Sequence, residues 1–130
     1  KQIIPQNFET RAVLIKDDFL RSIKIASAFT NSKSGEVNIK IDSKNNLVLI
    51  KSQSQEIGEN IAELKADVDG PDKEIVFNPR FILDGINSIN TSKEVILIND
   101  GSSPAAIKAI DGKNEEILDN YIYILMPIKI

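Results

Sequence analysis

Paired carboxylates and two serines are the residues of this chain that could do chemistry. Asp17–Asp18 lie at an expected helix start, where adjacent positions do not face each other, and Glu115–Glu116 lie in an expected hairpin, so we interpret both pairs as solvated charges. Asp69–Asp72 lacks the alternating acidic positions and final glutamate of a calcium loop, and its Gly-Pro centre predicts a turn. Ser102 and Ser103 have no histidine to activate them, because the chain contains none.

The composition excludes further kinds of site. Without cysteine there is no disulfide, thiolate nucleophile or thiolate metal ligand, and without histidine the commonest general base and transition-metal ligand are missing. The six glycines do not cluster, so neither a P-loop nor a dinucleotide-binding loop is present. We therefore expect no catalytic residue, no metal and no cofactor, and a binding or scaffold domain rather than an enzyme.

The net charge of −3 argues against a protein that holds nucleic acid over its whole surface. With five Phe and two Tyr, a base-stacking platform is also disfavoured. No apolar run is long enough to span a membrane, so we expect no membrane partner. The chain opens with Lys1 and no long apolar segment follows, which favours a single domain cut from a longer protein.

Apolar spacing predicts the elements that must position any site. In the first half we expect a strand over 8–15, a helix opening at 16–18, and strands over 37–41 and 47–50. Residues 57–68 fit either a helix or a strand, and we favour an edge strand. In the second half we expect strands over 74–77, 95–98, 104–110 and 117–126.

The second helix has a clear start, with Asn78 as N-cap and Pro79 at the first helical position. Phe81 lies on its apolar face, as Phe19 does on the first helix, and we expect both rings in the core. The order strand, helix, three strands then occurs twice. We therefore predict an α+β fold of two pseudo-repeated units, with two helices packed on a curved antiparallel sheet.

The last ten residues, 121–130, are a strand-like run interrupted by Pro127, which has no N–H for a sheet ladder. Chain ends are usually polar and poorly ordered. An apolar end therefore needs a partner, which is either the core of the domain or a groove where another molecule docks.

Three segments, 77–86, 100–107 and 123–130, carry motifs that together resemble the C-terminal domain of the bacterial DNA polymerase III beta subunit, the sliding clamp. Ile3-Ile4-Pro5 and Ile57-Gly58-Glu59 are similar to its linker end and an edge strand. The resemblance covers essentially the whole chain. It implies a DNA-clamp domain, with 1–8 as the end of an interdomain linker and 9–130 as the third of three similar domains.

In that family two protomers join head to tail as a homodimer around duplex DNA, which they hold without sequence preference. The resemblance implies a cytoplasmic DNA replication processivity factor that is not itself an enzyme. Its partners would be the catalytic subunit of DNA polymerase III, the clamp loader and other clamp-binding proteins. A non-enzymatic interaction domain of similar fold, with no replication role, is the alternative.

The family receives short partner peptides in a pocket beside its C-terminus. The matching positions here are Asn78, Phe81, Ser102, Pro104, Ile124, Leu125, Met126, Pro127, Ile128, Lys129 and Ile130. Ile124 and Leu125 also fit a core strand. Phe81 stands where the family often has tyrosine, and Lys129 where arginine is common, so a hydroxyl contact and a planar fork are absent. The pocket walls supplied by the preceding domain lie outside this chain.

Two further sets of positions follow from the resemblance. Arg21, Lys24 and Arg80 are the basic helix residues expected to face DNA, although they also fit ordinary solvated charges. Ala28 and Phe29 match positions that meet the neighbouring protomer, and Phe29 fits a local core equally well.

Overall fold

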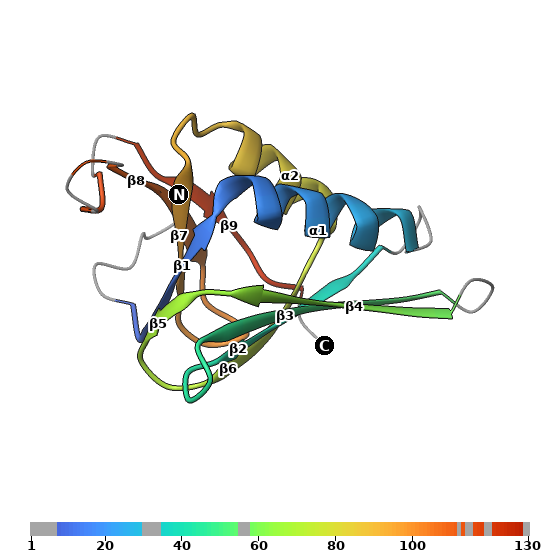
Figure 1. The fold of residues 1–130 in the computed structure, drawn as a ribbon. Coiled ribbons are helices and arrows are strands. Elements are labelled where there is room, and N and C mark those ends of the chain that lie inside the picture. The colour runs from blue at the N-terminus through green and yellow to red at the C-terminus, as the bar shows by residue number, and fades with distance from the viewer. Residues whose placement is uncertain are drawn as a thin grey trace.

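The computed structural model describes residues 8–29, 35–54, 58–111, 113, 116–118 and 121–128 (Figure 1). The elements follow one another along the chain as β1 (Thr10–Ile15), α1 (Lys16–Phe29), β2 (Val37–Asp42), β3 (Leu47–Ser54), β4 (Gly58–Lys65), β5 (Asp67–Asp69), β6 (Lys73–Phe77), α2 (Pro79–Asn87), β7 (Lys93–Ile98), β8 (Ala105–Ile110) and β9 (Tyr123–Leu125).

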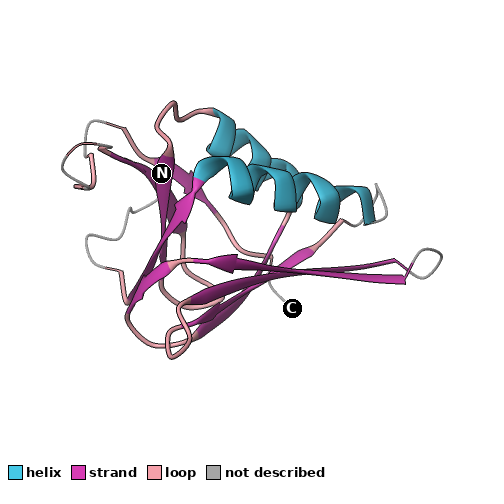
Figure 2. Ribbon diagram, in the orientation of Figure 1, coloured by secondary structure: helices cyan, strands magenta, loops and turns pink. Residues whose placement is uncertain are grey.

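The described strands form two antiparallel sheets, one with the order β5-β1-β7-β8-β9 and one with the order β4-β3-β2-β6. The two helices pack against each other and lie together on one side of the sheets (Figure 2). The predicted α+β fold, with two helices on antiparallel sheets, is confirmed, and its strands are divided between two sheets.

The two halves of the chain exchange their first strands. Strand β1 belongs to the first half, yet it pairs with β7 of the second half, with Arg11 opposite Leu97. Strand β6 opens the second half, yet it pairs with β2 of the first half, with Asn38 opposite Val76. Each sheet therefore needs strands from both halves, which ties the two pseudo-repeated units into one folding unit.

Residues 58–69 are extended, as we expected, but they form two strands. Strand β4 is an edge of the four-stranded sheet, and β5 pairs with β1 in the other sheet. The switch occurs at Ala66 and is held by Asn46, whose backbone carbonyl accepts from the N–H of Ala66 at 3.0 Å and whose side-chain oxygen accepts from the N–H of Val68 at 3.1 Å. The prediction of one continuous strand was therefore wrong at this point.

The prediction of a last strand over 117–126 was also too long, because β9 covers only Tyr123–Leu125. Ile117 forms a bridge with Ile110, and Tyr123 lies opposite Ile107. Strand β8 therefore meets the described part of the final segment in two separate places.

The main core lies between the helices and the sheets. Phe19, Ile23 and Ala26 of α1 are fully buried in it, as the predicted apolar stripe requires. A smaller cluster on the outer face of the five-stranded sheet contains Val95 and Leu97 and is partly covered by Phe8 and Ile122. Burial on both faces explains why residues 95–98 of β7 are an unbroken apolar run, whereas a half-exposed strand would alternate.

Candidate functional site

Helix α2 begins as its sequence predicted. Asn78 has an extended backbone, and its side chain accepts a hydrogen bond from the N–H of Arg80 at 2.9 Å, while Pro79 is buried at the first helical position. Phe81 is 50% exposed, so the expectation that its ring lies in the core was wrong. Ile82 and Ile86 hold the helix on the core instead, which leaves Phe81 as an aromatic side chain at the surface.

The chain that follows β9 crosses from one sheet to the other. Leu125 lies opposite Ala105 of β8 in the five-stranded sheet. Three residues later, the N–H of Ile128 donates to the carbonyl of Val76 at 2.8 Å, on β6 at the edge of the four-stranded sheet. Val76 lies two positions before Asn78. The tail therefore passes beside the start of α2.

The side chains of the tail are divided among three surroundings. Leu125 packs into the main core, whereas Ile124 packs against the cluster on the outer face of the sheet. Pro127 is buried, but Met126 is 37% exposed. Among residues 124–128, Met126 is thus the apolar side chain that the structure leaves most open to a partner. Lys129 and Ile130 lie outside the described residues.

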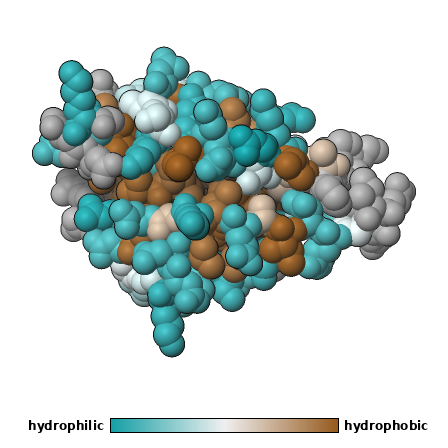
Figure 3. Space-filling view, viewed as in Figure 1, coloured by the Kyte–Doolittle hydropathy of each residue, from teal (hydrophilic) through white to brown (hydrophobic). Residues whose placement is uncertain are grey.

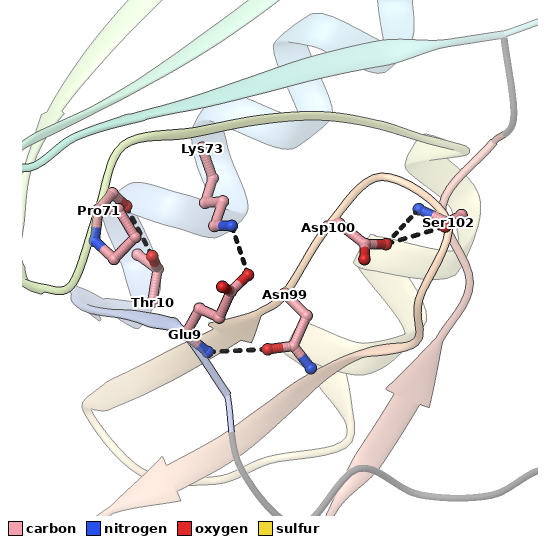
Figure 4. A network of polar contacts seen from close by, with 7 residues as sticks. All are labelled: Glu9, Thr10, Pro71, Lys73, Asn99, Asp100 and Ser102. Atoms are coloured by element: carbon pink, nitrogen blue, oxygen red, sulfur yellow. Dashed lines mark hydrogen bonds and ion pairs between the residues drawn. The ribbon is translucent and has the colours of Figure 1, made fainter.

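The pairing of β8 with β9 also brings Pro104 toward the tail. Ala105 is paired with Leu125, so the next positions along the two segments are Pro104 and Met126. Ser102 lies two positions before Pro104, in the turn that connects β7 to β8. Its N–H and its hydroxyl both donate to Asp100 Oδ1 at 2.9 Å (Figure 4). These hydrogen bonds lower the pKa of Asp100.

A polar network holds this turn against the start of the domain (Figure 4). Asn99 Oδ1 accepts from the N–H of Glu9 at 2.8 Å, and Glu9 Oε1 pairs with Lys73 Nζ at 2.6 Å. The hydroxyl of Thr10 donates to the carbonyl of Pro71 at 2.6 Å. Because Asn99 immediately precedes Asp100, the network fixes the base of the turn that carries Ser102. This network was not predicted from the sequence, since its members are far apart along the chain.

The basic residues named from the sequence all lie on helix surfaces. Arg21, Lys24 and Arg80 are exposed, and Arg21 Nη1 lies 3.6 Å from Asp18 Oδ1, one turn earlier on α1. The exposed side of α1 also carries Asp17. It is therefore mixed in charge, and it would attract a phosphate backbone only weakly.

Ala28 is exposed near the end of α1, and the described structure gives the backbone of Phe29 but not its side chain. Apolar atoms also gather on the face where α1 lies over β4 (Figure 3). Ile25 of α1 and Ile61 of β4 are both about half exposed. Exposed apolar side chains thus occur away from the tail, so exposure by itself does not identify a binding site.

The described residues contain no group of three or more histidine, cysteine, aspartate or glutamate side chains that could hold a metal ion. Neither of the helices they form is long and apolar enough to cross a membrane.

The family described as "DNA polymerase III beta subunit, C-terminal domain" matches residues 1–128. The chain belongs to this family. The expected resemblance is therefore confirmed over nearly its whole length, and the two-helix fold on antiparallel sheets is the fold of that domain.

Individual beta subunits agree with this assignment. The DNA polymerase III beta subunit of Thermotoga maritima superposes with a TM-score of 0.86 at 30% identity, over 98% of this chain and 33% of that one. The beta sliding clamp of Helicobacter pylori is 28% identical over 134 residues, and that of Staphylococcus epidermidis is 27% identical over 129 residues, each match covering 98% of this chain. This chain spans about a third of the length of these relatives.

One contact near the site was not foreseen from the sequence. Gly85 of α2 is buried directly against the ring of Tyr123. A glycine on the apolar face of a helix is a sequence signal for close approach, because every other residue except proline would be a better helix former. The signal gives no partner, however, and Tyr123 is 38 positions away in the sequence.

Proposed function

We propose that this chain is the third domain of a DNA sliding clamp, with residues 1–8 as the end of the interdomain linker and 9–130 as the domain. In the complete protein, two protomers joined head to tail would encircle duplex DNA and tether the replicative polymerase to it. The domain itself would be non-catalytic and would act in the cytoplasm. Membership of the beta subunit family supports this proposal.

The proposed peptide site lies where the C-terminal tail passes the start of α2. The observation that carries it is the hydrogen bond from Ile128 to Val76, because it draws the tail from β9 toward the residues that precede Asn78. Phe81 and Met126 are both exposed apolar side chains in this region. They are the proposed contacts for the apolar anchors of a partner peptide.

The occupant that fits these residues is a short linear peptide with apolar anchor residues. Burying apolar surface contributes about 25 cal/mol per Å², and a few anchors carry most of the affinity in such complexes. Met126 suits the role because its unbranched side chain adapts to different partners. Pro104 and Ser102 would line the β8 side, and Lys129 and Ile130 would complete the tail side. DNA polymerase III, the clamp loader and other clamp-binding proteins are the proposed sources of such peptides.

The proposed DNA-facing residues are Arg21 and Lys24 on α1 and Arg80 on α2. A ring that slides must not bind tightly, since each phosphate contact adds friction and salt dependence. The mixed charge of α1 supports such weak contact. We expect this domain alone to bind duplex DNA weakly and without sequence preference. Ala28 and Phe29 are the proposed contacts with the second protomer.

The test is a titration of the 130-residue chain with a fluorescent peptide that carries a polymerase clamp-binding motif. We expect saturable binding, and we expect Met126→Asp to weaken it about tenfold or more by placing a charge against the apolar anchor. Ile61→Asp is the matched control, because it puts the same charge on another exposed apolar side chain, an isoleucine of β4. Unchanged binding by Met126→Asp would show that the tail is not the receptor.

A further inference from the structure

Helix α2 and strand β9 touch at Gly85, a position where the helix has no side chain and a neighbouring side chain would have to shift to admit one. A Cβ atom at Gly85 would lie 2.7 Å from Cδ1 and 2.9 Å from Cε1 of Tyr123, and 3.0 Å from Cδ1 of Ile107. Real Cβ atoms essentially never approach other atoms within 3.0 Å. The ring of Tyr123 therefore packs directly on the backbone of α2, and its position and that of the helix are fixed by each other.

This contact is one of two that frame the proposed peptide site. The other is the hydrogen bond from the N–H of Ile128 to the carbonyl of Val76. Two segments of the chain connect these two contacts, residues 77–84 and residues 124–127. The first segment carries Phe81 and the second carries Met126, so each exposed side chain lies between two fixed points.

Gly85 and Tyr123 are also close to these side chains along their own elements. Phe81 lies four residues before Gly85, which places the two on the same side of α2, one turn apart. Met126 lies three residues after Tyr123, just past the end of β9. The Gly85–Tyr123 contact thus lies one helical turn from Phe81 and three residues from Met126.

We propose that the contact between Gly85 and Tyr123 sets the spacing between Phe81 and Met126, and so determines which apolar peptides the site accepts. This inference rests on the proposed function. Gly85 and Tyr123 are positioning residues, and Phe81 and Met126 make the contact with the peptide. The ligand class is a short peptide whose two apolar anchors are separated to match this spacing.

The contact can be altered without unfolding the domain. Tyr123 is only partly buried, so its ring has room to move toward solvent when a methyl group is added at Gly85. Burial raises the pKa of Tyr123, and the nearby Asp84 and Tyr121 raise it further, which places that ring at the polar margin of the core. Ile82 and Ile86 continue to anchor α2.

The test compares peptide affinity and melting temperature in four proteins: the unaltered chain, Gly85→Ala, Tyr123→Phe and the double variant Gly85→Ala/Tyr123→Val. We expect Gly85→Ala to weaken binding of the polymerase-motif peptide by roughly tenfold, the loss of one anchor contact, with little change in Tm. Tyr123→Phe should bind like the unaltered chain, because the ring and not the hydroxyl makes the contact. The double variant should recover most of the affinity, because the smaller valine leaves room for the new methyl group.

The outcomes separate this inference from the function on which it rests. If the unaltered chain fails to bind the peptide, the proposed site is wrong. If the unaltered chain binds and Gly85→Ala binds equally well, the site stands and the positioning role is overturned. A loss of affinity in Gly85→Ala that follows a large fall in Tm, and that the double variant does not restore, also overturns it.

Discussion

Ile128 and Val76 join the end of the chain to the four-stranded sheet, since the N–H of Ile128 donates to the carbonyl of Val76 at 2.8 Å. Three residues earlier the same segment is paired with β8 in the other sheet. The tail therefore stabilises the domain as well as forming part of the proposed site.

The first prediction concerns this hydrogen bond. Ile128→Pro removes the donor and should lower the free energy of unfolding by about 1 kcal/mol, the usual net contribution of one such bond. Ile128→Val keeps the N–H and most of the apolar surface, and it is the control. Urea unfolding of both variants measures the effect. Equal losses in the two would show that the side chain matters and the hydrogen bond does not.

The second prediction concerns Glu94, which is 0% exposed on the inner face of the five-stranded sheet. Its carboxylate oxygens have no hydrogen-bond partner among the described residues. Desolvation by burial raises the pKa of Glu94 from 4.5 to about 8, against the opposing effect of the Lys16 charge. The folded chain therefore keeps a proton that the unfolded chain releases.

Stability should accordingly fall as the pH rises from 4.5 to about 8, by up to about 1.4 kcal/mol per pH unit, and then level off. Glu94→Gln removes this dependence. The free energy of unfolding of the variant, measured relative to that of the unaltered chain, should therefore increase by an amount on the order of 2–4 kcal/mol when the pH is raised from 5 to 9. Glu63→Gln, on exposed β4, controls for the loss of one negative charge. Denaturant unfolding at both pH values is the measurement, and a constant difference would exclude a buried protonated carboxyl.

The third prediction concerns the cap of α2. Asn78→Ala removes the acceptor of the Arg80 N–H and should destabilise the domain by about 1 kcal/mol. Asn78→Asp keeps an acceptor oxygen at the same place and should destabilise the domain much less than Asn78→Ala does. Thermal unfolding of the two variants is the measurement, and equal losses of stability in Asn78→Ala and Asn78→Asp would contradict a role for the acceptor oxygen.

The fourth prediction concerns the turn before β6. Gly70 has a φ of +116°, and a Cβ atom there would lie 2.1 Å from the carbonyl oxygen of Glu9. Gly70→Ala should therefore cost several kcal/mol, on the order of 2–4, through both backbone strain and a clash. Gly101→Ala is the matched control, since nothing lies within 4 Å of its added methyl group. Similar stability of the two variants in urea would contradict the close approach of β1 to this turn.

Some features of this protein follow from the sequence alone because they depend on neighbouring residues. The start of α2 is determined by Asn78 and Pro79, and the buried stripe of α1 by the helical spacing of Phe19, Ile23 and Ala26. The lack of histidine and cysteine excludes whole classes of chemistry whatever the fold. The order of motifs was sufficient to indicate the family.

The tertiary structure decided the features that depend on residues far apart in the chain. Periodicity identifies a strand but not its partner, so the exchange of β1 and β6 between the two sheets could not be predicted. An apolar side chain on a helix is buried only if something covers it, and the packing of α2 leaves Phe81 uncovered. The contact of Gly85 with Tyr123 likewise requires that two elements meet at one register, which no local pattern specifies.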